Sequence, residues 1–247
     1  MNQAMKTIEG WYCLHDFRTI DWTKWKTVSS GQREQALHEF KSLLKKWEMI
    51  ESNNKGSHSV YTVVGQKADL LFMILRPTMK ELNEVETEFN KTILADFTVP
   101  AYSYISVIEK SSYSQMAENP FEDPAMLAKL HPTIPKNEYL CFYPMSKLRA
   151  EKTNWFMLPV EERKRLMFEH IGTGKPYNEQ VKRIITGSIG FDDYEWGVTL
   201  FSDDALQFKK LIYDTRFDEV SAVYGIFGSF FIGNLLKQDR INQFFHI

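Results

Sequence analysis

The first residue of this sequence whose type could carry chemistry is His170. It ends the run Pro159–His170, which has the apolar spacing of an amphipathic helix, and a glycine-containing turn follows it. A charged imidazole is stabilised at the C-terminus of a helix, so an exposed helix-ending histidine is one interpretation. The other is an axial iron ligand that a rigid helix presents to a porphyrin. Position alone leaves both open.

Tyr143 opens the second candidate, the run from Tyr143 through Pro144, Met145 and Ser146 to Lys147, at the end of an apolar strand. A tyrosine there can be a core residue whose hydroxyl is satisfied. It can also be oxidised to a radical beside a haem iron, and the nearby lysine can bind a propionate as a point charge.

A third candidate is the dense block Arg216–Ser221 followed by Val223–Phe231. Its structural interpretation is a final strand with glycines where another group approaches closely. Two other motifs fail. Gly172–Lys175 lacks the remaining residues of a phosphate-binding loop, and the six histidines show no zinc-ligand spacing.

Composition excludes several classes of protein. The chain has 247 residues, 43% hydrophobic and 25% charged, with a net charge of -2, which does not favour a nucleic-acid or anionic membrane partner. No apolar run approaches the roughly 20 residues of a membrane span, and no signal peptide is visible. The two cysteines, Cys13 and Cys141, are typical of reduced thiols, so we expect a cytoplasmic protein.

The elements that must position these residues follow one order twice. Strand-like and helical patterns alternate as βαββαβ on each side of a proline-rich connection, which predicts an α+β fold of two ferredoxin-like halves with facing antiparallel sheets. We expect the halves to be residues 1–110 and 138–247, joined by 111–137, with the porphyrin in the second. The later predicted elements are a strand at Glu138–Met145, helices at Pro159–His170, Gln180–Ile185 and Asp204–Tyr213, a hairpin at Ile185–Phe201, and a strand at Ala222–Ile232.

Taken together, these residues resemble the coproheme decarboxylases of Gram-positive bacteria, in the chlorite-dismutase-like superfamily. The resemblance runs nearly end to end. It is carried by Gly10–Tyr12, His15–Arg18, Gly65–Leu70, Phe89–Lys91, Cys141–Met145, Asn154–Trp155, Gly187–Phe201 and Arg216–Phe231.

The resemblance implies a homopentamer that binds iron coproporphyrin III as both substrate and cofactor. Hydrogen peroxide would be the oxidant, and two propionates would be decarboxylated to vinyl groups, giving haem b. A transient contact with the coproporphyrin ferrochelatase is also expected. By resemblance His170 is the proximal iron ligand, Tyr143 the radical-bearing residue, and Lys147 the neighbour of the reacting propionate. The other expected porphyrin contacts are Lys129, Pro144, Met145, Ser146, Arg183, Arg216 and Ser221.

Several positions depart from the family pattern. Lys129 replaces an arginine, His131 a tyrosine and Val223 an arginine, and Ser111–Ser114 alters a stretch of the connection. Arg183 stands where decarboxylases usually have glutamine, and chlorite dismutases carry a distal arginine there that can stabilise an anionic oxygen ligand. A solvent-facing helical arginine is the structural alternative for Arg183.

Three hypotheses follow. The first is a coproheme decarboxylase, the second a haem peroxidase or chlorite-dismutase-like enzyme that uses Arg183, and the third a porphyrin-binding paralogue with weak activity.

Overall fold

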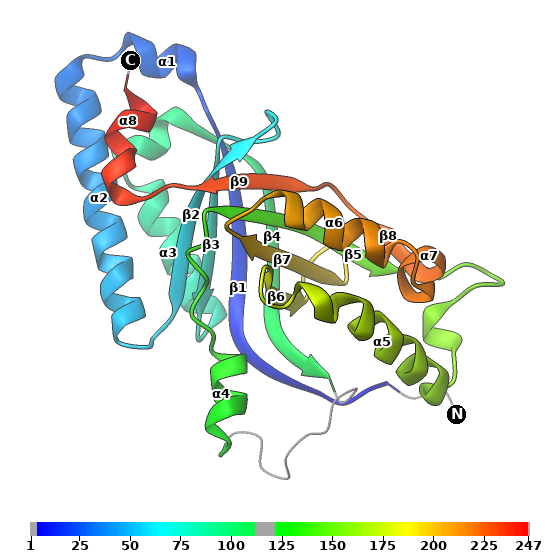
Figure 1. The fold of residues 1–247 in the computed structure, drawn as a ribbon. Coiled ribbons are helices and arrows are strands. Elements are labelled where there is room, and N and C mark those ends of the chain that lie inside the picture. The colour runs from blue at the N-terminus through cyan, green and yellow to red at the C-terminus, as the bar shows by residue number, and fades with distance from the viewer. Residues whose placement is uncertain (1–3, 112–121, 247) are drawn as a thin grey trace. The chain divides into compact units, whose positions relative to one another are not determined.

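The computed structural model describes residues 4–111 and 122–246 (Figure 1). Contacts divide the chain into two compact units. Unit 1 comprises Met1–Gly10, Ser106–His131 and Asn137–Phe230, and unit 2 comprises Trp11–Ile105, Pro132–Lys136 and Phe231–Ile247. These bounds differ from the expected halves because β1 (Thr7–Ile20) and β4 (Thr98–Ser111) each begin in one unit and end in the other.

Unit 2 is an antiparallel sheet covered by helices. Strand β3 pairs with both β1 and β2, and β2 pairs with β9. Helices α2 and α3 lie against β2 and β3 (Figure 1) and share one apolar core with them, which includes Phe40, Phe72 and Phe89. Besides β1 and β4, the elements of this unit are α1 (Trp22–Thr27), α2 (Ser30–Ser52), β2 (Ser57–Val64), β3 (Leu70–Arg76), α3 (Met79–Asn90), a 3-10 turn (Ile93–Phe97), β9 (Phe231–Leu235), a 3-10 turn (Gln238–Arg240) and α8 (Ile241–Phe245).

In unit 1, antiparallel strands pair in the order β4–β6–β7–β5–β8. Helices α5, α6 and α7 pack together beside these strands. The remaining elements are α4 (Pro124–Leu130), β5 (Tyr139–Lys147), a 3-10 turn (Trp155–Met157), α5 (Val160–Gly174), a 3-10 turn (Lys175–Tyr177), β6 (Lys182–Gly187), β7 (Trp196–Ser202), α6 (Leu206–Thr215), α7 (Glu219–Tyr224) and β8 (Gly225–Phe227). The predicted α+β class and the repeated βαββαβ order are confirmed.

Two predicted elements are wrong. Gln180–Ile185 is not a helix, because Lys182–Gly187 forms β6 and exchanges hydrogen bonds with β7 along its length. Ala222–Ile232 is not one strand. Asp218 caps α7 by accepting a hydrogen bond from the Ser221 amide, so the helix runs to Tyr224 and the short β8 follows.

Part of the proline-rich connection forms a helix, α4. Pro124 occupies the first turn of α4 and Asp123 caps it, an arrangement that favours a helix start. The predicted helix Asp204–Tyr213 is α6: Ala205 is its N-cap, and the Asp204 carboxylate accepts the Leu206 amide. Residues 112–114 of the altered stretch lie outside the described residues.

Within residues 4–111 and 122–246, no helix has both the length and the apolar character that crossing a bilayer requires.

Candidate functional site

One face of the unit 1 sheet carries four of the ten residues predicted for the site. Residues directly opposite each other on antiparallel strands point to the same side. Tyr143 on β5 is opposite Val198 on β7, which is opposite Ile185 on β6. Cys141, Leu200 and Arg183 form the adjacent row. We call this side of the sheet the Tyr143 face; it also holds Met145 and Lys147, because alternate residues of a strand share a face.

Tyr143 is buried among aromatic rings. Its ring stacks on Phe230 with centroids 4.4 Å apart, and Phe227 approaches at 5.9 Å. Burial raises the pKa of the Tyr143 phenol, the neighbouring Cys141 thiol raises it further, and the charges of Arg216 and Arg183 act in the opposite direction. The phenol therefore keeps its proton at neutral pH, and both arginines lie within electrostatic reach of it.

Lys147 is the buried cation of the Tyr143 face, with 7% of its surface exposed. Its ammonium lies 4.8 Å from the centroid of the Trp155 ring, which itself packs edge-on against Tyr224. Burial lowers the pKa of Lys147 to about 8, and the carboxylates of Asp218 and Glu195 limit that fall. A buried amine of this kind is a ready partner for an anionic group.

His170 does not end its helix, as the sequence predicted, because α5 continues to Gly174. Its Nδ1 lies 2.9 Å from Oδ2 of Asp218, whose side chain is 6% exposed. Burial raises the pKa of Asp218, but the hydrogen bonds from His170 and the Ser221 amide hold that pKa below its ordinary value. A carboxylate at Nδ1 fixes the imidazole so that Nε2 carries the free lone pair, the arrangement found behind metal-bound histidines.

Arg183 connects α5 to the Tyr143 face. It lies on β6, half-buried, and its Nη2 donates to the Gly174 carbonyl at 2.6 Å. His170 is four residues before Gly174 and therefore on the same side of α5. The solvent-facing helical alternative for Arg183 is wrong, since the residue is on a strand and its Nε is buried without a partner among the described residues.

The other residues predicted for the site spread around this face. Arg216 lies 3.6 Å over the Phe227 ring and so joins the Tyr143 cluster. Ser221 is buried on α7, three residues after Asp218, which is the partner of His170. Pro144 and Ser146 lie on the opposite side of β5 from Tyr143. There the Pro144 carbonyl accepts the Gly228 amide and the Ser146 hydroxyl accepts the Glu195 amide.

Lys129 is not brought to Tyr143 by any interaction among the described residues. It is exposed on α4, and its charge lowers the pKa of Lys110, which burial also lowers. His131 ends the same helix.

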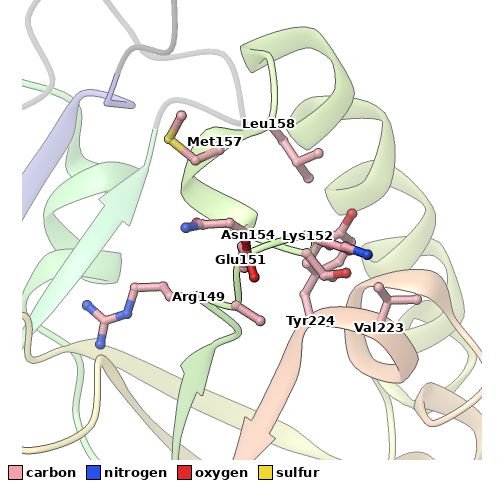
Figure 2. Close-up of a pocket in the computed structure, with 10 residues that line it drawn as sticks. Arg149, Glu151, Lys152, Asn154, Met157, Leu158, Val223 and Tyr224 are labelled. Atoms are coloured by element: carbon pink, nitrogen blue, oxygen red, sulfur yellow. The ribbon is translucent and has the colours of Figure 1, made fainter.

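Val223 lines a separate pocket of about 520 Å³ between α7 and the segment after β5 (Figure 2). The pocket has a mixed charged and apolar lining that includes Arg149, Lys152 and Met157. Figure 2 shows Arg149 extending away from α7, consistent with its ion pair to Glu195 at 3.6 Å. Tyr224 lines the pocket and also contacts Trp155, so the pocket adjoins the Lys147 end of β5.

Sequence reasoning missed Asp218, Phe230 and Ile185 as members of the site. Asp218 and Phe230 fall inside the block that the sequence singled out, but no spacing links Asp218 to a histidine 48 residues away. Ile185 was expected at a helix end. On β6 it is 50% exposed on an otherwise buried face, which marks where that face is open.

Comparison with known proteins agrees with this architecture. A family model described as chlorite dismutase matches residues 33–236. The chain is 43% identical to a structure described as a novel heme-binding protein from Thermus thermophilus, with a TM-score of 0.95 over 99% of this chain and 98% of that chain. A chlorite dismutase mutant from Candidatus Nitrospira defluvii is 22% identical, with a TM-score of 0.78 over 96% and 95%. A putative chlorite dismutase is 19% identical, with a TM-score of 0.74 over 96% and 100%. The similarity to these last two structures is a similarity of fold.

Proposed function

The chain belongs to the chlorite dismutase family, and from that premise we propose that it is a coproheme decarboxylase. It would bind iron coproporphyrin III and convert two of its propionates to vinyl groups with hydrogen peroxide, giving haem b. The observation that carries the proposal is the pairing on one sheet face of a buried neutral phenol, Tyr143, with a buried cation, Lys147, beside a histidine whose Nδ1 is held by Asp218.

The residues fit an iron porphyrin. No group of three or more His, Cys, Asp or Glu side chains that could hold a bare metal ion occurs in the part of the chain that the structure describes. A porphyrin needs a single protein ligand, and His170 meets that need through Nε2. Ile185 is half-exposed, and the buried Nε of Arg183 has no partner among the described residues, so the face offers an apolar surface and a hydrogen-bond donor. The bound iron porphyrin would supply the oxidising power for reaction with peroxide.

The roles of the protein groups follow from their surroundings. Lys147 holds one propionate by charge, and Tyr143 removes a hydrogen atom from that propionate after its phenol has been oxidised. Each propionate then loses carbon dioxide, one proton and two electrons in all, and one hydrogen peroxide accepts the electrons and is reduced to two waters. Holding the carboxylate against the phenol is a positioning task, which the rigid strand β5 can perform because both residues belong to it.

A second function is favoured by Arg183. A guanidinium on the Tyr143 face can stabilise an anionic oxygen ligand, which would support peroxidase or chlorite-dismutase-like chemistry. In the structure its Nη2 is occupied by the Gly174 carbonyl, while Nε is unpaired among the described residues. Arg183→Gln should raise decarboxylation if this side chain hinders peroxide handling, and equal rates in the two proteins would exclude that role.

The test is a peroxide titration of the purified protein loaded with iron coproporphyrin III, followed by mass spectrometry of the porphyrin. Loss of two carboxyl groups supports the decarboxylase, oxygen release from chlorite supports the second function, and binding without turnover indicates a porphyrin-binding paralogue. Tyr143→Phe is the matched control, since it should bind the porphyrin and yield no vinyl product. Normal turnover by this variant would remove Tyr143 from the mechanism.

We also propose the assembly and the location that the family resemblance suggests. A homopentamer should have a native mass five times the 29.0 kDa of one chain, measurable by native mass spectrometry. Two buried thiols that form no disulfide, Cys13 and Cys141, suit the reducing cytoplasm. A transient contact with the coproporphyrin ferrochelatase would appear as substrate transfer faster than release into solution.

A further inference from the structure

Glu109 is a carboxyl group on the Tyr143 face that the proposed mechanism does not use. It lies on β4, whose Val107 is opposite Gly187 of β6. Glu109 is two residues further on and so points to the same side as Val107. Strands β6 and β7 separate β4 from β5, and three strand spacings put Glu109 roughly 14 Å from Tyr143 across the face.

Neighbouring residues hold the carboxyl group of Glu109 in place. Its Oε1 accepts a hydrogen bond from the Trp196 indole at 3.2 Å. Its Oε2 occupies the space over Gly187 that a Cβ would fill. Trp196 and Gly187 are opposite each other on β7 and β6, so two strands fix the position of the carboxyl group on the face.

The surroundings of Glu109 raise the pKa of its carboxyl group, so that an anion placed beside it can bring a proton onto it on binding. Burial raises the pKa of Glu109, the hydrogen bond from Trp196 lowers it, and the carboxylate of Glu9 on β1 raises it again. On β4 itself, the adjacent Lys110 points to the other side of the strand. Among the described residues, no cation is one of the groups that shift the pKa of Glu109. Near Tyr143, in contrast, Lys147 can balance the charge of an anion.

We propose that Glu109 is a specificity residue that donates a hydrogen bond, as a carboxylic acid, to a carboxylate on the porphyrin edge remote from Tyr143. This inference rests on the proposed function, since it assumes a porphyrin on the Tyr143 face. A porphyrin with carboxylates around its whole rim would then be held at two places. Lys147 would bind one carboxylate by charge, and Glu109 would share a proton with another. A porphyrin without a carboxylate at the second position would lose that contact.

Calorimetric binding of metal-free coproporphyrin III tests this without iron ligation or turnover. Titrations at one pH in buffers of different ionisation enthalpy measure the protons taken up on binding. The wild-type protein should take up a substantial part of one proton, and Glu109→Gln should take up none while binding within a fewfold, because its amide still donates. Glu109→Ala should bind about tenfold more weakly, as expected for loss of a hydrogen bond to a charged group. Asp193→Asn, at an exposed carboxylate of the β6–β7 turn, should match the wild type.

Equal proton uptake by the wild type and Glu109→Gln, or unchanged affinity in Glu109→Ala, would overturn the inference while leaving the decarboxylase proposal intact. Failure of the wild type to bind either metal-free or iron coproporphyrin III would overturn both.

Discussion

Asp218 has two tasks, one for each of its carboxylate oxygens. Oδ2 holds Nδ1 of His170, and Oδ1 accepts the amide of Ser221 and so starts α7. The same charge also acts on Lys147, where it opposes the effect of burial. One side chain therefore orients the candidate ligand, begins the helix behind it and supports the buried cation.

Asp218→Asn should separate these tasks. Asparagine is as good a helix N-cap as aspartate, so α7 should persist, but the imidazole loses its anionic partner. We expect the affinity for iron coproporphyrin III to fall roughly tenfold to a hundredfold, the usual cost of losing such a partner. Absorbance titration measures it. Asp204→Asn is the matched control, because this carboxylate also accepts a helix amide, that of Leu206, and its hydrogen bonds among the described residues include no imidazole. A similar loss in both variants would contradict the assignment.

Lys147 should make the stability of the protein depend on pH. Its pKa is about 8 when folded and 10.5 ordinarily, so between these values the unfolded chain holds more protons than the folded one. The free energy of unfolding should therefore rise with pH across this window, by at most about 1.4 kcal/mol per pH unit, relative to Lys147→Met. Urea unfolding of both proteins near pH 7 and near pH 10 measures the difference. A difference that stays constant, or moves the other way, would mean that Lys147 is not buried as a neutral amine.

At the level of elements, the sequence predicted those with strong periodicity and missed those decided by partners. Helix α2 shows the first kind: Leu37, Phe40, Leu44 and Trp47 recur at helical spacing, and all four are buried in the core of unit 2. Part of strand β6 was predicted as a helix because its pattern is short. Ile184 and Thr186 can be recognised as one side of a strand only once β6 is paired with β7. Helix α7 depends on one cap, Asp218, inside a run of strand-forming residues.

Substitution of Gly10 should test how closely α4 packs on β1 within unit 1. A Cβ at this position would overlap the backbone carbonyl of Leu130, which cannot move without α4. Gly10→Ala should lower the free energy of unfolding by about 1–3 kcal/mol and speed amide exchange in α4. Gly31→Ala is the control, because nothing lies near that glycine in the first turn of α2, and it should stabilise the protein by up to about 1 kcal/mol. Equal effects of the two substitutions would contradict the close contact.

At the level of the whole chain, the residues proposed to hold the porphyrin, from Lys129 to Ser221, all belong to unit 1. The resemblance placed the porphyrin in the second half of the chain, and Tyr143, Lys147, His170 and Arg216 all fall in unit 1. That these residues hold a porphyrin stays a prediction. Sequence reasoning could not predict the Tyr143 face, because the rows that join Tyr143 to Ile185 and Cys141 to Arg183 depend on strand register. Register is set by pairing of distant segments and leaves little trace in local pattern.

A ligand confined to unit 1 should protect that unit selectively. Binding stabilises only the states that retain the site, so amides that exchange by local opening of α5, α7 and β5 should slow by roughly 100-fold when the ligand is at 100 times its Kd. Amides in α2 and α3, whose core is formed by unit 2 residues, should exchange at unchanged rates unless they require global unfolding. Hydrogen exchange with and without iron coproporphyrin III, read by mass spectrometry, gives both measurements in one sample. His170→Ala serves as the control, because it should remove most of the protection in α5 by removing the iron ligand. Protection that is equal in α2 and α5, or that survives in His170→Ala, would place the ligand elsewhere in the chain.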